Sequence, residues 1–296
     1  MHFPTYSKGK YWLVFAPVLA LLAASGAVGA DDAGTLTAVR VGEPAELDGK
    51  ADDRAWTLAR PLKLVAKRVL PPNLDTSTEV ELRAVYTATH LYILARWRDA
   101  TQDVSHKSWM WSSSKSAYEE GKDREDMFAV AFQHTGEFTA DMLSGHNAVW
   151  DVWHWKAFRT NPQGYAMDKT HRYYSSPPQG KAKEHPARNG AKVWIARPED
   201  QGDSAERASP APSERQGDQV PQYVRTVPSA SAADVRAKGA WADGWWTLEL
   251  SRKLDTGYED DTALDPAKRY RMGVAAFDRT GDMDKASGLI VLDFAK

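Results

Sequence analysis

Period-two alternation of apolar and polar residues is the feature that most restricts how this chain can fold. In segment 80–86 every second residue is apolar or aromatic, and the same is true of segment 91–97. Such alternation is typical of strands with one buried face, and the turn-like residues between the two segments predict a hairpin. Further strand candidates are 126–132, 149–155, 245–250, 269–277 and 288–294. Because long helical periodicity is hard to find, the sequence predicts an all-β antiparallel fold, either a sandwich or a barrel.

Residues 1–30 have the layout of a secretory signal peptide. Lys8 and Lys10 precede a short apolar stretch, which ends in the small-residue run SGAVGA. The apolar stretch is shorter than the roughly 20 residues that a membrane-spanning helix needs, so cleavage after Ala30 is predicted. We therefore expect a periplasmic protein that begins at residue 31.

Segment 176–240 differs in composition from the rest of the chain. It is rich in proline, serine, glycine and charged residues and contains few large apolar side chains. Such a segment buries little surface to offset its ordering entropy. We therefore predict one domain over residues 31–296, with a polar, partly disordered insertion at about 176–240.

Charge and cysteine content exclude several functions. Without the two lysines of the leader, 36 basic residues face 40 acidic ones, a formal charge of −4, so nucleic acid is not an expected partner. The chain has no cysteine. This excludes disulfides, thiolate metal sites, iron–sulfur clusters and the thioether attachment of a c-type haem.

The segment 141–169 concentrates potential ligands. It contains three tryptophans, two histidines, two methionines and two lysines. If its central part, WDVWHWKA, forms a strand, Trp150, His154 and Lys156 lie on one face and Trp153 and Trp155 on the other. The tryptophans can serve packing alone, stack on sugar rings, or surround a planar porphyrin-like ligand. A zinc or copper centre has weak support, since no H-x-H or H-x-x-x-H spacing occurs.

Several segments resemble known families. Residues 46–56 and 80–99 resemble the opening of sandwich domains related to family 9 carbohydrate-binding modules and the DOMON group. Residues 142–168, with VWDVWHWKA at their centre, are similar to the haem-binding domain of the ethylbenzene dehydrogenase γ-subunit family, as are 244–257 and 270–288. The resemblance implies an immunoglobulin-like β-sandwich over most of residues 37–294.

The resemblance also implies a function. One haem b is expected, bound non-covalently and ligated by a methionine and a lysine, whose matching positions are Met142 and Lys285; His146 is a rival ligand. The expected residues around the haem are Trp150, Trp153, His154, Trp155, Lys156 and Arg159. With both axial positions filled, the expected role is electron transfer rather than catalysis. The expected partner is a redox protein such as a molybdenum oxidoreductase, a c-type cytochrome or a membrane quinol-oxidising protein.

One alternative comes from a different class of protein. It is a haem-free carbohydrate-binding module that would use Trp150, Trp153 and Trp155 as a stacking platform for sugar rings. The sequence alone does not separate this alternative from the haem protein.

Overall fold

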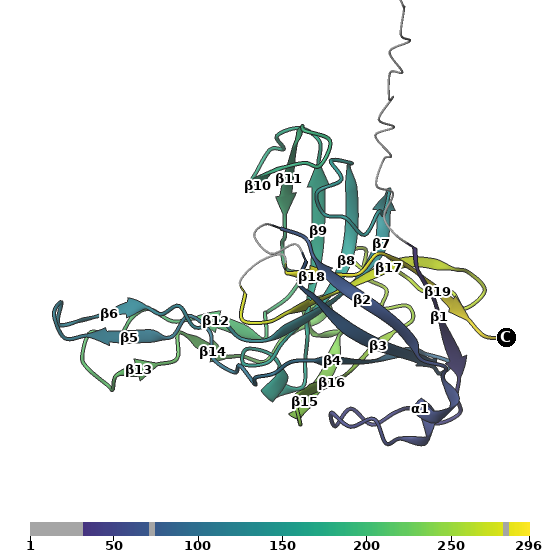
Figure 1. Ribbon diagram of the computed structural model, residues 1–296, viewed down its shortest axis with the longest axis horizontal. Coiled ribbons are helices and arrows are strands. Elements are labelled where there is room, and N and C mark those ends of the chain that lie inside the picture. Colours follow the sequence, from purple (N-terminus) through teal and green to yellow (C-terminus); the bar gives the residue numbers. More distant parts are fainter. Residues whose placement is uncertain (1–31, 71–74, 281–283) are drawn as a thin grey trace, which may run out of the picture.

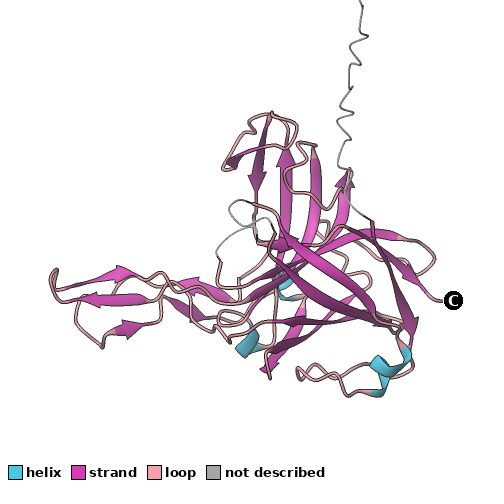
Figure 2. Cartoon of the chain, in the orientation of Figure 1, coloured by secondary structure: helices cyan, strands magenta, loops and turns pink. Residues whose placement is uncertain are grey.

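The computed structural model describes residues 32–70, 75–280 and 284–296. The predicted signal peptide lies outside these ranges. Strands dominate the described chain (Figure 2). Its helices are α1 (Arg54–Leu58) and the 3-10 turns η1 (Asn161–Gln163) and η2 (Ala230–Ala233). None of the described helices has the length and apolar character needed to cross a membrane.

Most of the strands join one large sheet (Figure 1). Its members are β1 (Asp32–Arg40), β2 (Leu62–Arg68), β3 (Ser77–Tyr86), β4 (His90–Arg98), β7 (Met127–Gly136), β8 (Ala148–Lys156), β9 (Met167–Tyr174), β10 (Lys183–Pro186), β11 (Lys192–Ala196), β15 (Arg236–Ala242), β16 (Trp245–Lys253), β17 (Tyr270–Phe277), β18 (Lys285–Ala286) and β19 (Leu289–Phe294). Their order is β10-β11-β9-β8-β7-β17-β18-β2-β3-β4-β16-β15.

Strand β1 closes part of this sheet on itself. It pairs in parallel with both β19 and β3, and β19 in turn pairs with β17. The ring β1-β19-β17-β18-β2-β3 therefore has no open edge, which removes sites for unwanted strand pairing. The all-β prediction is confirmed, whereas this closed ring departs from two simple stacked antiparallel sheets.

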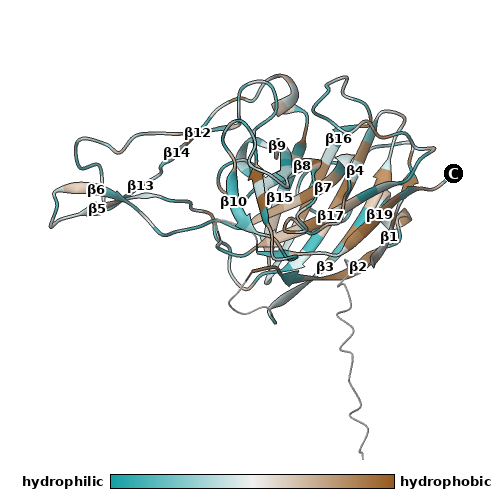
Figure 3. Ribbon diagram, turned by 90° about the horizontal axis from the view of Figure 1, so that it is seen from above, coloured by the Kyte–Doolittle hydropathy of each residue, from teal (hydrophilic) through white to brown (hydrophobic). Residues whose placement is uncertain are grey.

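The strands predicted from alternation are present with small changes at their ends. The hairpin of β3 and β4 places Val80 opposite Trp97 and Tyr86 opposite Leu91. Segments 126–132 and 149–155 form the antiparallel neighbours β7 and β8. The last three predicted strands are β16, β17 and β19. Apolar residues gather along these strands (Figure 3).

Much of segment 176–240 is paired into short strands. Strands β10 and β11 extend the main sheet beside β9. A projecting arm carries β12 (Glu206–Ala208), paired with β14 (Tyr223–Arg225), and β13 (Gln219–Val220), paired with β5 (Trp109–Ser112), which also pairs with β6 (Ala117–Glu120) (Figure 1). Composition did not indicate these pairings, because some of them join the insertion to strands that lie earlier in the chain, namely β5 and β9.

Strand β8 separates two apolar clusters. Trp153 and Trp155 belong to the main core, together with Trp97 and Trp246 from β4 and β16. Trp150 belongs to a smaller cluster on the opposite face of the sheet. Alternation along a strand sends neighbouring side chains to opposite faces, so this division follows from the sequence.

Candidate functional site

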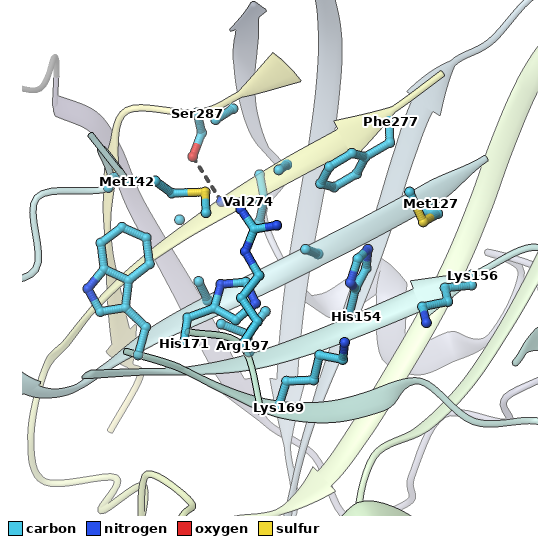
Figure 4. A pocket seen from close by; sticks show the side chains of 18 of the residues that line it. Met127, Met142, His154, Lys156, Lys169, His171, Arg197, Val274, Phe277 and Ser287 are labelled. Atoms are coloured by element: carbon cyan, nitrogen blue, oxygen red, sulfur yellow. Dashed lines mark hydrogen bonds between the residues drawn. The ribbon is translucent and has the colours of Figure 1, made fainter. Parts of the chain in front are cut away.

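A cavity of about 270 Å³ lies on the face of the sheet formed by β9, β8, β7 and β17 (Figure 4). Small residues form its floor. Ala129 of β7 lies opposite Ala275 of β17, and Ala131 lies opposite Gly273. Because the side chain at each of these four positions is at most a methyl group, no large side chain projects from the sheet there, which leaves room for a ligand.

Larger side chains close the two ends of the cavity. At one end, Phe138 packs on Trp150 with ring centroids 4.5 Å apart, and Met142 packs against the same cluster. At the other end, Met127 of β7 lies opposite Phe277 of β17. Figure 4 shows Met142 and Met127 toward opposite ends. The cavity therefore has apolar, sulfur-bearing ends around a flat centre.

The ionisable residues that line the cavity are basic. Six are lysine or arginine, and none of the described lining residues is an aspartate or glutamate; the six are Lys107, Arg124, Lys156, Arg159, Lys169 and Arg197. Glu206, next to the cavity, contacts the Lys156 ammonium group and accepts a hydrogen bond from Arg159 Nη1 at 3.1 Å. A cavity surrounded by this charge attracts an anionic ligand.

Burial in this basic environment disfavours further positive charge. It lowers the pKa of Lys156 to about 7, with Arg159 adding to the effect, and it lowers the pKa of Lys169 as well. The pKa values of His154 and His171 lie well below their ordinary range for the same reason. Burial and the nearby Arg159 lower the pKa of His106 to about 3. The imidazoles are therefore neutral at physiological pH.

The structure brings together four of the six residues expected around a cofactor. Trp150, His154 and Lys156 lie on the cavity face of β8, and Arg159 follows from the turn after that strand. Trp153 and Trp155 lie instead in the main core on the opposite face, each 0% exposed. They point away from the cavity because each is an odd number of residues from Trp150 or His154 along the strand.

The three candidate ligands of iron occupy different places. Met142 lines the cavity. Lys285 lies in β18, where its ammonium nitrogen is 3.0 Å from Asp284 Oδ2, and it faces a separate pocket instead. His146 is exposed, with its Nδ1 3.6 Å from Glu137 Oε2, and is not among the residues that line the cavity. The structure therefore does not bring Met142 and Lys285 together.

Other lining residues were not among the six expected around the cofactor, although Lys169 and His171 lie close in sequence to the tryptophan-rich segment. Lys169 and His171 come from β9, whose register places them opposite Val152 and Trp150. Alternation within MDKTHRYY could have located this pair on one face of a strand. Arg197 and Lys107 come from distant loops, and no local sequence signal marks them.

Comparisons with known proteins found one family match and distant likenesses to solved structures. A family model described as ethylbenzene dehydrogenase matches residues 53–287. A comparison with curated proteins found no match. Among solved structures, a candidate carbohydrate-binding protein from Bacteroides uniformis is 10% identical, with a TM-score of 0.44, over 88% of this chain and 99% of that one.

A family 9 carbohydrate-binding module from Caldicellulosiruptor kristjanssonii in complex with cellotriose is 13% identical, with a TM-score of 0.36, over 88% of this chain and 95% of that one. These structural likenesses are too distant to carry an argument about ligands. The family match, in contrast, spans well over half of the chain. The chain belongs to the ethylbenzene dehydrogenase family.

Proposed function

We propose that this protein binds one haem b non-covalently in the cavity on β7, β8, β9 and β17 and serves as a periplasmic electron-transfer protein or subunit. The observation that carries the proposal is the composition of the cavity, which combines a flat floor of small residues, apolar ends and basic groups without carboxylates. Haem is planar and apolar, and it carries two carboxylates, so each of these features fits it.

The donor atoms in the cavity also fit an iron porphyrin. Met142 offers a thioether, and His154 has a buried Nε2 atom without a hydrogen-bond partner among the described residues. Lys285 remains the second ligand that the family resemblance implies, but it would have to leave its ion pair with Asp284 and turn into the cavity. Met142 is therefore the better placed of the two.

Different residues of the cavity would contact different parts of the haem. Lys107, Arg124 and Arg197 would neutralise its carboxylates, while Phe138 and Trp150 would keep water from one end. When bound, haem supplies reversible one-electron exchange. A redox protein is the corresponding partner, either a molybdenum oxidoreductase, a c-type cytochrome or a quinol-oxidising membrane protein.

The alternative function, a carbohydrate-binding module, requires an exposed surface of tryptophan rings. Trp150, Trp153 and Trp155 are 4%, 0% and 0% exposed, and they lie on two different faces of β8. A stacking platform needs rings that present a common exposed face to a sugar. These three tryptophans do not form such a platform.

The visible spectrum of the purified protein tests the proposal. We expect a b-type Soret band that shifts on reduction with dithionite. Lys169→Met removes one half-buried basic group at nearly constant volume and should weaken haem binding several-fold. Lys192→Met, at an exposed site on β11, is the matched control and should have no effect. A wild type that stays colourless with added haem, yet is retained in a glycan affinity gel, would refute the proposal.

A further inference from the structure

Two groups of three aspartates bring their carboxylates close together in the described part of the chain. In each group, one oxygen of every residue lies within 4.8 Å of the corresponding oxygens of the other two. Carboxylates at such distances repel one another unless a cation or protons neutralise them. The groups are Asp151, Asp168 and Asp261, which we call the arginine triad, and Asp99, Asp126 and Asp278, which we call the loop triad.

The arginine triad contains its own cation. Arg252 Nη1 lies 2.8 Å from both Asp151 Oδ2 and Asp261 Oδ1. It also lies 3.6 Å from Asp168 Oδ2. A guanidinium held in this position neutralises the carboxylates without an ion from solvent.

The loop triad lacks such a cation at its buried end. Asp99 and Asp126 are 5% and 0% exposed, and neither forms an ion pair with a basic side chain of the described residues. The nearest basic groups reach only the exposed member, Asp278, with Lys285 Nζ at 4.0 Å and Arg279 Nε at 3.8 Å. The two buried carboxylates are therefore left without positive charge.

One oxygen of Asp126 also lacks a hydrogen-bond donor. Its Oδ2 accepts hydrogen bonds from Trp246 Nε1 at 3.0 Å and from the Asp103 amide at 2.8 Å. Its Oδ1 is buried and accepts none from the described residues. A buried carboxylate oxygen without a partner is costly, so it indicates a ligand that brings positive charge. In the absence of a cation, burial raises the pKa of Asp126 to about 7 and that of Asp99 to about 6.

We propose that the loop triad binds one calcium ion. Calcium takes six to eight oxygen ligands at about 2.3–2.6 Å, so one ion can contact oxygens that lie up to about 4.8 Å apart. Asp99 and Asp278 also line a pocket of about 300 Å³, which gives the ion a path from solvent and room for water ligands. The ion would join the end of β4, the start of β7 and the end of β17, because the three aspartates directly flank these strands. This site lies beyond the proposed haem function and does not depend on it.

Calcium titration of the mature chain, after treatment with a chelator, tests the site. We expect a Kd of about 10⁻⁴–10⁻³ M, the range of extracellular calcium modules. Calcium at about 10 mM should then raise the Tm by about 3–10 °C. Terbium, which replaces calcium at oxygen sites, should luminesce when tryptophan is excited, because Trp246 donates a hydrogen bond to Asp126.

Two variants and two controls locate the ion. Asp278→Asn changes an exposed ligand, so it should not disturb folding, and Asp99→Asn changes a buried one. Each should weaken calcium binding more than about tenfold, because affinity depends on the number of ligand charges. Asp261→Asn removes a carboxylate from the arginine triad, and Asp218→Asn removes an exposed one elsewhere. Both controls should keep the calcium affinity of the wild type.

Two results would overturn the inference. One is an unchanged calcium affinity in Asp278→Asn and Asp99→Asn, since the ion would then bind elsewhere. The other is a wild type with neither a calcium-dependent Tm nor tryptophan-sensitised terbium luminescence. Neither readout involves haem, so a protein that binds calcium but no haem would refute the proposed function alone.

Discussion

The two faces of β8 carry similar residue types but use them differently. On the core face, Asp151 is paired with Arg252, whose Nη1 lies 2.8 Å from Asp151 Oδ2. On the same face, Trp155 packs against Trp246 with ring centroids 5.0 Å apart. On the cavity face, Lys156 and His154 lie beside a floor of small residues and among other basic groups. The core face is filled and its lining includes carboxylates paired with Arg252, whereas the cavity face is open and no aspartate or glutamate is among the described residues that line it. The proposed haem would fill the cavity face.

The largest expected effect comes from removing the core counter-charge with Arg252→Met. Arg252 Nη1 also lies 2.8 Å from Asp261 Oδ1 and 3.6 Å from Asp168 Oδ2, and all four residues are buried. Loss of the guanidinium leaves the carboxylates buried without a cation. We expect the free energy of unfolding to fall by about 3–5 kcal/mol, measured by urea denaturation of the haem-free protein.

Arg279→Met is the control for this change, because Arg279 is exposed and pairs loosely with Asp103 and Asp278 at 3.8 Å. It should change the free energy of unfolding by less than about 0.5 kcal/mol. Equal effects of the two substitutions would show that the buried cluster is not held together by Arg252.

A matched pair of glycines gives the next largest effect. A Cβ atom at Gly239 of β15 would lie 2.5 Å from Cζ2 of Trp155 in the core, whereas one at Gly273 would meet Ala140 at an ordinary 3.4 Å. Gly239→Ala should therefore cost about 1–3 kcal/mol of stability through overpacking. Gly273→Ala should change stability by less than about 0.5 kcal/mol. Thermal or urea unfolding of both variants tests whether only the core face is filled.

The stability of the core side should also depend on pH through Asp126. Its Oδ2 accepts hydrogen bonds from Trp246 Nε1 and the Asp103 amide, while its Oδ1 is buried without a partner among the described residues. Burial raises the pKa of Asp126 to about 7. Because this pKa lies above the unfolded value of about 3.9, the corresponding stability is present at low pH and is lost as the pH rises through 7.

Asp126→Asn should remove this dependence, because the amide is neutral and its oxygen can accept the same two hydrogen bonds. Between pH 5 and pH 8 we expect the wild type to lose roughly 2–3 kcal/mol more stability than the variant. Urea unfolding at several pH values measures the difference, with the exposed Asp218→Asn as control. Parallel curves for the wild type and Asp126→Asn would show that Asp126 is ionised throughout this range.

Alternation in the sequence predicted the positions of the strands and the faces of their side chains. It could not predict which distant strands would be neighbours in the sheet. It located β3, β4, β7, β8, β16, β17 and β19, and it placed Trp150 and His154 on one face of β8. It did not reveal that Ala131 and Gly273, far apart in the chain, would be neighbours in the cavity floor. Nor did it show that β18 directs Lys285 to a different pocket, since the alternation of a two-residue strand leaves no periodic signal.

Ala131→Leu should have the smallest effect on stability. It should nevertheless have a large effect on haem binding. Ala131 lies in the cavity floor between Val152 of β8 and Gly273 of β17, so a larger side chain would extend into open space rather than into packed neighbours. We expect the free energy of unfolding to change by less than about 0.5 kcal/mol. Haem titration followed at the Soret band should show binding weakened more than about tenfold, because the side chain occupies the space of the ligand. Unchanged haem binding would place the haem elsewhere, and a large loss of stability would mean that the cavity face is as closely packed as the core.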